Sequence, residues 1–492
     1  MLLLIPIFFI SCSDNVYEEP PVISVWDGSS SDKQWYDESA KAYSITSANA
    51  LKGLSDLVAE GISFEDKTIN LEVDIDLNNK PWTPIGSIYR KTNKNWFKGT
   101  FDGNNHKIIN LYVKAEEDDT AVGLFGGVDS GEIRNLTIES GTIENTQDTA
   151  AGIVGAYLGD GDFKLINCTN KAKVVSKDSA AGIIGRIYGK GNAEISKCIN
   201  YGSITGDGKA GGIAAINANG NVEISYSRNF GSIASNLNPQ SKGNAGGLLG
   251  YMNDNCNISN LKNSGPVKGA NFAGGIVGYM AGGKGFYSIN YCENEAEINS
   301  GQNSGGIVGL TGDVEQYTIW ECINKGTIKS DRSAGGVIGG SSMGNGHFAS
   351  CKNTGIVIAT DYAGGIGGAL RGCDNYFDRC SGGTAEIKAD YPGRLIGTAD
   401  SGPGQANKLN IDDNNGDSYG NLRTAGCFAD ATMLPIWIIE GGTLHGLSPV
   451  THDTNQAQLT FMENTKWEQD GSVTKYTEKN GTTFRIGKEG IV

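Results

Sequence analysis

The residues that could act as acids, bases or nucleophiles are scattered along this chain. Glycoside hydrolysis needs two carboxyl groups flanking the scissile bond, and lyase chemistry needs an Arg or Lys base beside calcium-binding carboxylates. The sequence offers Gly346-His347-Phe348 and Asp412-Asp413, while Arg186 and Arg371 stand isolated. No Ser-His-Asp or Cys-His arrangement can be argued, because the histidines lie in separate regions, at His106, His347, His445 and His452. The sequence therefore predicts no catalytic residue and favours a protein without catalysis.

Two tyrosines are the candidates for ligand binding. Tyr251 and Tyr279 each follow a repeated glycine-rich block and precede a methionine. Rings at equivalent places in successive repeats can stack on a flat sheet and bind a sugar ring or an apolar side chain of a partner. The favoured alternative is an aromatic ladder that only covers the sheet. A longer step in the repeat adds the loop SNLNPQSKGN, residues 235–244, next to this pair, and such insertions are often the binding part of a repeat protein.

One segment could bind a metal ion. Asp412–Asp417 is rich in oxygen ligands and could hold calcium. It departs from the EF-hand loop, since the sixth and twelfth positions counted from Asp413 are Ser418 and Thr424, where Gly and Glu belong. A solvated turn is the favoured interpretation, and the sequence predicts no other cofactor and no metal site.

The N-terminal segment predicts export and a lipid anchor. Residues 1–10 (MLLLIPIFFI) are apolar but too few to span a bilayer, so they are typical of the apolar core of a secretory signal. The following Ser11-Cys12 resembles the bacterial lipobox, which implies lipidation at Cys12 and a protein anchored by lipid to the bacterial outer membrane, exposed at the surface. The alternative is a disordered apolar N-terminus with a chance cysteine.

The charge of the chain restricts its partners. Fifty-five acidic and 40 basic residues give a net charge of −15, and no basic stripe is present, so nucleic acid is not expected as a partner. An acidic surface also repels anionic glycans unless cations bridge them. We expect a surface glycan or a host protein as partner, contact with the membrane only through the lipid anchor, and a monomer.

All these candidates must be positioned by a repeat of about thirty residues. A block such as Ala-Gly-Gly-Ile-Val-Gly returns in steps of 28 to 35 residues, and its first apolar residue falls at Leu124, Ile153, Ile183, Ile213, Leu248, Ile276, Ile307, Val337, Ile366 and Leu395. A fixed period of this size predicts stacked units. Each unit holds three short apolar stretches bounded by Gly or Asn, without a helical period. The sequence therefore predicts an all-β fold, a right-handed parallel β-helix of about ten coils with three strands each.

Two columns of side chains support this stacking. One column contains Cys168, Cys198, Ser227, Leu261, Cys292, Cys322, Cys351 and Cys380. We interpret these cysteines as buried thiols, because Ser and Leu share their column and parallel neighbours meet poorly for a disulfide. The other column contains Asn170, Asn200, Asn229, Asn263, Asn294, Asn324 and Asn353, which can bond amide to amide and tolerate a left-handed turn.

Segments outside the repeat predict covers for the two ends. Residues 47–61 place Leu51, Leu54, Leu57 and Val58 on one face of a capping helix, with Ser47 as N-cap and Gly61 after the last turn. The predicted organisation is a signal peptide and tether (1–21), an N-terminal cap with irregular first coils (22–115), the β-helix repeats (116–399), a loop and C-terminal cap strand (400–450), and a hairpin or tail (451–492).

The repeat also resembles a known family. The blocks AGGIVG and SGGIVG, preceded by WTPIG and GTFDGNNHKIINLYV, resemble the GLUG-motif repeat proteins over roughly residues 26–437. The resemblance implies a bacterial surface lipoprotein or adhesin with a right-handed β-helix of the pectate-lyase-like class. One branch of this group accompanies a zinc metallopeptidase that cleaves immunoglobulin A. That activity is not implied here, because the chain lacks His-Glu-x-x-His.

Three functions follow as hypotheses. The leading one is a cell-surface lipoprotein that acts as an adhesin, or as a scaffold binding a glycan or host protein, without catalysis. The alternative is a polysaccharide lyase or glycoside hydrolase with an atypical site on the β-helix. The third is a passive structural stalk.

Overall fold

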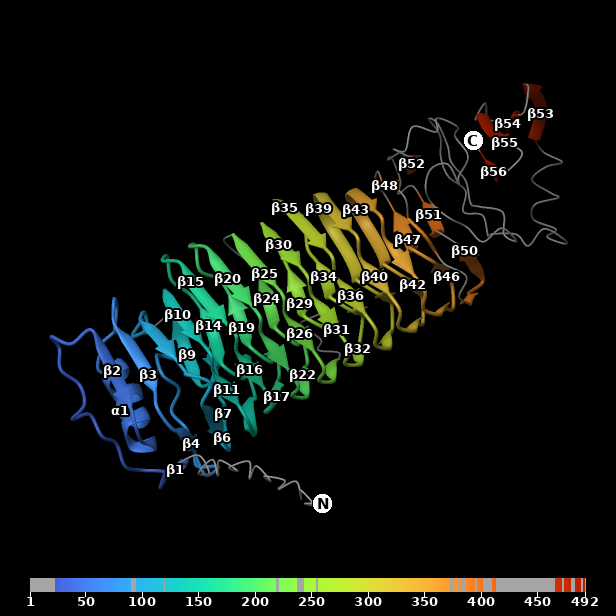
Figure 1. The fold of residues 1–492 in the computed structure, drawn as a ribbon. Coiled ribbons are helices and arrows are strands. Elements are labelled where there is room, and N and C mark those ends of the chain that lie inside the picture. Colours follow the sequence, from blue (N-terminus) through green and yellow to red (C-terminus); the bar gives the residue numbers. More distant parts are fainter. Residues whose placement is uncertain are drawn as a thin grey trace, which may run out of the picture.

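The computed structural model of the chain describes residues 23–371, except 90–93, 119, 218–220, 237–242 and 254. Beyond these it describes the segments 375–378, 380–382, 386–393, 396–400 and 409–412, and four strands between residues 465 and 491. Short strands stack side by side into an elongated rod and run across its long axis (Figure 1). In the described part of the chain, one α-helix accompanies these strands, α1 (Ala48–Ala59).

Each regular coil of the rod consists of five short strands. In one coil these are β13 (Thr149–Ala151), β14 (Val154–Tyr157), β15 (Phe163–Ile166), β16 (Thr169–Asn170) and β17 (Lys173–Ser176). Every strand pairs in parallel with its equivalent one coil away, as Phe163 pairs with Ala193. The predicted right-handed parallel β-helix is therefore confirmed, with ten or eleven strands in each of its three simple sheets.

The number of strands per coil differs from the expected three. The unit that begins near Ala210 contains two further strands, β23 (Lys209–Gly211) and β26 (Arg228–Asn229). The sequence pattern does not reveal β26, because this two-residue strand carries an exposed arginine and a buried asparagine in place of apolar residues. Glycine corners divide the remainder of the coil into pieces too short to show an alternating pattern.

The remaining large sheet contains two columns of strands. One column includes β14 and its equivalents, and the other includes β15 and its equivalents. The two columns become one sheet because β39 (Val308–Trp320) and β43 (Ile338–Ala349) run through both without a break. These two columns carry the candidate sites described below.

The glycine pair of the repeat is required by close approach of the backbone. A Cβ added at Gly274 would lie 1.8 Å from the carbonyl oxygen of Val277. A Cβ added at Gly275 would lie 2.0 Å from the carbonyl oxygen of Gly306, in the next coil. Both distances are far inside van der Waals contact, so a side chain at either place would force the coils apart. The glycine excess is thus explained by the corners of the rod.

The asparagine column forms the expected ladder in the core. All seven asparagines have no exposed surface, and the side-chain Nδ2 of each of the first six donates to Oδ1 of the next at 2.7 to 2.9 Å. Their backbone is not left-handed, in contrast to the prediction. The left-handed residue lies three positions earlier, for example Asn167 (φ 53°) and Tyr226 (φ 50°). The side chain of the ladder asparagine holds the corner that follows, since Asn200 Nδ2 also donates to the Gly202 carbonyl.

The cysteines of the column are buried thiols outside any disulfide, as predicted. All six are at most 1% exposed, and a further buried cysteine, Cys256, lies outside the column. Burial raises the pKa of the thiols of Cys168 and Cys322. Ser227 occupies the same column and directs its Oγ to the Ser225 carbonyl at 2.9 Å. These residues fill the core of the rod.

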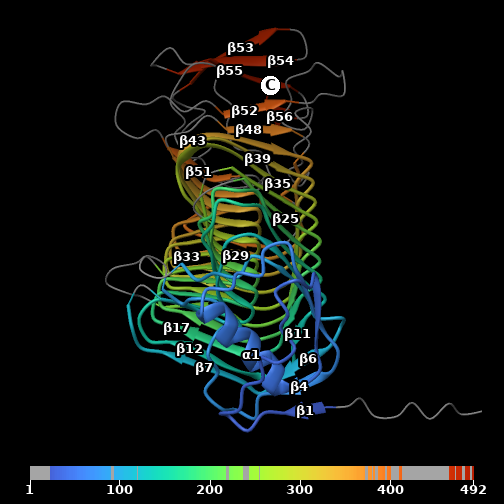
Figure 2. The ribbon, with the colours of Figure 1, turned by 90° about the vertical axis from the view of Figure 1, so that its left-hand side faces the viewer.

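The N-terminal end of the rod is covered by the predicted helix. Helix α1 lies in front of the stacked coils when the rod is viewed along its axis (Figure 2). The backbone N–H of Ala50 donates to Ser47 Oγ at 3.1 Å, which confirms Ser47 as N-cap. Leu51, Leu54, Leu57 and Val58 are all buried, so the helix closes the apolar mouth of the solenoid.

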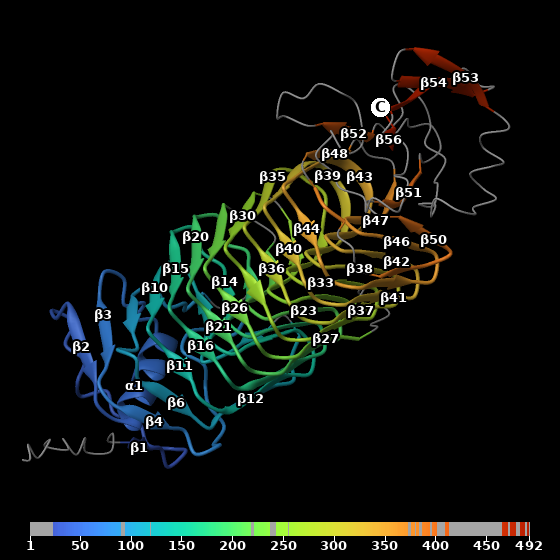
Figure 3. The ribbon, with the colours of Figure 1, turned by 45° about the vertical axis from the view of Figure 1, so that its right-hand side comes forward.

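At the far end, strands continue past residue 395. The strands β51 (Ile396–Asp400) and β52 (Leu409–Asp412) pair in parallel with β47 (Gly367–Arg371) and β48 (Asn375–Asp378), at the end of the stack in Figure 3. The cap strand expected at residues 433–439 lies outside the described residues. In the C-terminal segment four strands form an antiparallel sheet, β53 (Thr465–Asp470), β54 (Val473–Glu478), β55 (Thr483–Gly487) and β56 (Gly490–Ile491).

Candidate functional site

Tyr251 and Tyr279 are brought together by the fold. Tyr251 lies in β29 (Leu249–Met252) and Tyr279 in β34 (Val277–Met280), where they are direct register partners. Their ring centroids are 5.8 Å apart and the ring planes are inclined by 53°, so the rings are tilted rather than stacked face to face. Phe272 packs against Tyr279 with centroids 5.4 Å apart, and burial raises the pKa of the Tyr279 hydroxyl. The pair therefore lies within an aromatic cluster that is partly buried.

The insertion before Leu248 enters the same part of the surface. Residues 237–242 of this loop lie outside the described residues, but Asn244 begins the strand that follows, β28 (Asn244–Gly246). Asn244 is a register partner of Lys209 and Phe272, and the Lys209 Nζ atom lies 5.9 Å from the ring centroid of Tyr251. The structure thus places Asn244, the last residue of the insertion, near the tyrosine pair, and ligand binding by this pair stays a prediction.

Among the candidate acid–base residues that the structure describes, Arg186, His106 and His347 are not brought together. Arg186 is buried and forms ion pairs with Asp148 and Asp178, so its guanidinium is engaged by two carboxylates. His106 Nδ1 lies 3.0 Å from Asp74 Oδ1 near the N-terminal end. His347 lies exposed in β43, far along the rod from His106.

The metal candidate and the lipidation site fall largely outside the described residues. Asp412 ends β52, whereas residues 413–417 and Cys12 are not described. Within the described part of the chain, no group of three or more His, Cys, Asp or Glu residues is arranged to hold a metal ion.

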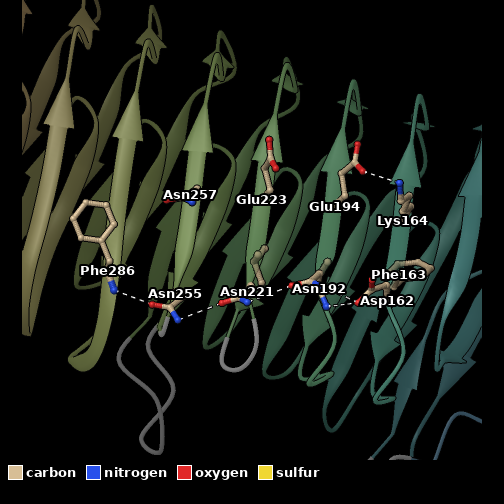
Figure 4. A pocket seen from close by; sticks show the side chains of 12 residues that line it. Asp162, Phe163, Lys164, Asn192, Glu194, Asn221, Glu223, Asn255, Asn257 and Phe286 are labelled. Carbon is tan, nitrogen blue, oxygen red and sulfur yellow. Dashed lines mark hydrogen bonds and ion pairs between the residues drawn. The ribbon is translucent and has the colours of Figure 1, made fainter.

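A groove that sequence reasoning missed lies across the neighbouring column of strands. It has a volume of about 420 Å³ and crosses β15, β20 (Ala193–Ser196), β25 (Val222–Ser225) and β30 (Cys256–Ser259) (Figure 4). The strands expose equivalent side chains, one per coil, because register pairing places every second residue outside. The groove therefore presents one outward side chain per coil at the same place, although the type of side chain changes.

A ladder of polar side chains forms one edge of the groove. Asn192 Nδ2 donates to Asp162 Oδ1 at 3.1 Å. Asn221 Nδ2 and Asn255 Nδ2 each donate to the Oδ1 atom of the preceding asparagine at 3.3 Å. The Phe286 backbone N–H ends the series by donating to Asn255 Oδ1 at 2.9 Å (Figure 4). These bonds orient one amide group per coil along the groove, with the remaining hydrogen-bonding capacity directed to solvent.

The floor of the groove carries charged and amide groups. Lys164, Glu194, Glu223 and Asn257 stand at equivalent places, and Lys164 Nζ lies 3.3 Å from Glu194 Oε2. The lining residues contain three carboxylates, of Asp162, Glu194 and Glu223, and one ammonium group, so their net charge is 1 − 3 = −2. The Phe286 side chain is 51% exposed and adds an apolar ring at one end.

A sequence signal for this groove did exist. Asp162, Asn192, Asn221 and Asn255 recur at the period of the repeat, each directly before the first residue of a strand. Asparagine and aspartate in such places are also ordinary turn residues, so the pattern predicted only turns between strands. The groove becomes visible when register places these residues side by side.

Comparison with known proteins gives local similarity. No family model matches the chain. A protein of Evansella cellulosilytica, provisionally named a Gly-rich membrane protein, is 31% identical over 120 residues, which are 24% of this chain and 13% of that protein. Halomucin of Haloquadratum walsbyi is 33% identical over 78 residues, which are 15% of this chain and 1% of halomucin. The chain thus spans a small fraction of both relatives.

A solved structure is also similar in part. A Bacteroides ovatus protein, provisionally described as an immunoglobulin A1 protease, has 17% sequence identity and a TM-score of 0.36, with 68% of this chain and 83% of the other covered. A match of this identity and TM-score says nothing about activity. In the part of our chain that the structure describes, no helix is both long and apolar enough to cross a lipid bilayer.

Proposed function

We propose that this chain is a surface-displayed β-helical scaffold that binds a neutral glycan along the groove between Asp162 and Phe286. The observation that carries the proposal is the repetition of one polar surface over successive coils. Coils of a parallel β-helix follow each other at about 4.8 Å, which is close to the length of one pyranose ring in an extended chain. A polymer of repeated sugar units therefore meets a polar edge group and a polar floor group at each step.

The groups in the groove suit sugar hydroxyls. Amides both donate and accept hydrogen bonds, and the carboxylates of Glu194 and Glu223 accept them. The exposed ring of Phe286 offers an apolar surface to the C–H face of a sugar. A groove of net charge −2 on a chain of net charge −15 favours neutral over anionic polysaccharides. Binding at Tyr251 and Tyr279, on the adjacent face, is the alternative location.

The surface location forms part of the same proposal. The apolar residues 1–10 followed by Cys12 support a lipid anchor in the outer membrane, and the glycine blocks support membership of the GLUG-motif proteins. One partial relative carries the name of a membrane protein. We expect palmitate labelling of the expressed protein to be lost in Cys12→Ser. Labelling that persists in this variant would contradict the anchor.

The groove is tested by binding to neutral oligosaccharides, first on a glycan array and then by calorimetry. Phe286→Ala and Asn221→Ala should each weaken binding at least tenfold, because the first removes the apolar face and the second interrupts the amide ladder. The matched control is Tyr226→Ala, which removes another exposed ring (61% exposed) at a corner outside the groove.

Other outcomes would assign a different function. Loss of binding in Tyr251→Ala and Tyr279→Ala, with Phe286→Ala unchanged, would place the site at the tyrosine pair. Release of reducing ends or unsaturated products from the bound polysaccharide would show an enzyme, with Glu194 and Glu223 as the first carboxylates to replace. If the protein binds neither a glycan nor a host matrix protein, the function that remains is that of a structural stalk.

A further inference from the structure

A second cavity lies on the adjacent face of the rod, where a column of outward side chains is interrupted. In register order this column runs Tyr251, Tyr279, Leu310, Gly340 and Ala369. The side chains thus become smaller from the two phenol rings to the isobutyl group of Leu310 and to none at Gly340, and Ala369 adds only a methyl group. The absence of a side chain at Gly340 leaves space between Leu310 and Ala369.

The opposite wall of this space comes from the sheet that contains β28. Its outward residues in register are Phe272, Asn303 and Ser333. Together the two walls enclose a pocket of about 240 Å³, which is somewhat below the usual size of a small-molecule site, about 300 Å³ or more. Phe272 is held against Tyr279 and lines one end of the pocket.

Gly340 is what keeps the pocket open. A Cβ placed there would lie 2.5 Å from Asn303 Nδ2, 3.0 Å from the Ala369 carbonyl oxygen and 3.2 Å from Leu310 Cδ1. The shortest contact is with the end of a side chain, so a substituent at residue 340 would occupy the cavity and displace the Asn303 amide. The same glycine therefore provides a means of blocking the pocket without replacing Arg332.

The chemistry of the pocket differs from that of the outer groove. Arg332 is the one charged residue among the residues that line it, and its guanidinium is 48% exposed at the rim. The Arg332 Nε atom lies 4.0 Å from Asp361 Oδ2, which is too long for a hydrogen bond. Ser333 Oγ donates to the Gly339 carbonyl at 2.7 Å and keeps lone pairs to accept a bond. Phe272 and Leu310 supply apolar contact.

We propose that this pocket binds a carboxylate-bearing monosaccharide, either free or at the end of a glycan. The guanidinium of Arg332 pairs with the carboxylate, for which its planar fork is suited. The Asn303 amide and the serine hydroxyls bond the ring hydroxyls, and Phe272 and Leu310 contact the C–H face of the ring. The site is independent of the outer groove, because it lies on another face and its lining carries the opposite sign of charge.

The test compares glucuronic acid with glucose, two sugars that differ by the carboxylate at C6. Saturation-transfer NMR on the full-length protein should show glucuronic acid binding at least tenfold more tightly than glucose. Arg332→Met should abolish this preference while the apolar part of the side chain is kept, and Gly340→Val should remove binding of both sugars by filling the cavity. Arg228→Met is the matched control, since Arg228 is exposed on a different sheet.

Three results would overturn the proposal. These are equal binding of the two sugars, an unchanged preference in Arg332→Met, or unchanged binding in Gly340→Val. If Gly340→Val fails to fold, as judged by circular dichroism, Gly340→Ala replaces it and should weaken glucuronic acid binding several-fold through displacement of Asn303. Phe286→Ala should leave glucuronic acid binding unchanged, so failure of this pocket is distinguishable from failure of the outer groove.

Discussion

At the scale of residues, the asparagine ladder shows how a polar side chain can define a β-helix. Asn229 Nδ2 donates to the Gly231 carbonyl and to Asn263 Oδ1, while its own Oδ1 accepts from Asn200 Nδ2. Each amide therefore closes a corner within its coil and joins the two neighbouring coils. A buried polar group that is hydrogen-bonded in this way specifies register as well as contributing to stability.

Removal of one amide should be costly. Asn229→Ala leaves the carbonyl of Gly231 and the facing amide atoms of Asn200 and Asn263 without these bonds in a dry core. At about 1–3 kcal/mol for each unsatisfied group, we expect a loss of about 3 kcal/mol in the free energy of unfolding, seen as a lower urea midpoint. Asn257→Ala, an exposed asparagine on a neighbouring strand, should change the free energy by less than about 0.5 kcal/mol. Equal effects of the two substitutions would contradict the structural role of the ladder.

At the scale of elements, the amino-acid pattern predicted helix α1 more accurately than the strands. Four apolar residues at helical spacing, Ser47 before them and Gly61 after them are local signals, and the helix forms between them. The strands are two to five residues long in most of the regular coil, so alternation has little room to appear. β26 carries its buried side chain as asparagine, and hydropathy therefore could not identify it. The predicted number of strands per coil was wrong because hydrogen bonding to neighbouring coils, rather than local preference, makes these segments extended.

The candidate sites were predictable only in part for a related reason. Tyr251 and Tyr279 were recognised because both follow the same conspicuous glycine block, and the fold does place them in contact. The polar edge of the outer groove has the same period, but each asparagine alone is an ordinary turn residue. The pocket at Gly340 was not predictable, because its cause is the absence of a side chain within a column that only register defines.

At the scale of the whole molecule, the rod is modular. Each coil contacts mainly its two neighbours, so stability is close to a sum of coil and interface contributions. The two proposed sites follow from this arrangement, because each is formed by side chains from successive coils. The outer groove ends at Phe286, before the coil that contains Leu310 and Arg332. Each site therefore depends on its own set of coils.

Deletion of one complete coil should therefore be tolerated. Removal of residues 308–337 joins Ile307 to Ile338, the register equivalent of Val308, and brings Asn294 opposite Asn353. We expect a folded rod that retains neutral glycan binding and loses glucuronic acid binding, because Leu310 and Arg332 are removed. Circular dichroism and the two binding assays measure this. Deletion of residues 308–322, half a coil, should unfold the distal part, and equal folding of both deletions would contradict the modular description.

The sequence by itself determined that this protein is a stack of coils with a capped N-terminus, a core of buried thiols and an asparagine column. It could do so because backbone hydrogen bonds between coils require coils of nearly equal length, and such coils make the sequence repeat with a nearly fixed period. The tertiary structure alone decided which outward residues lie together. Side chains about thirty residues apart become neighbours through register, and neither the acidic groove from Asp162 to Phe286 nor the pocket beside Arg332 exists within a single repeat.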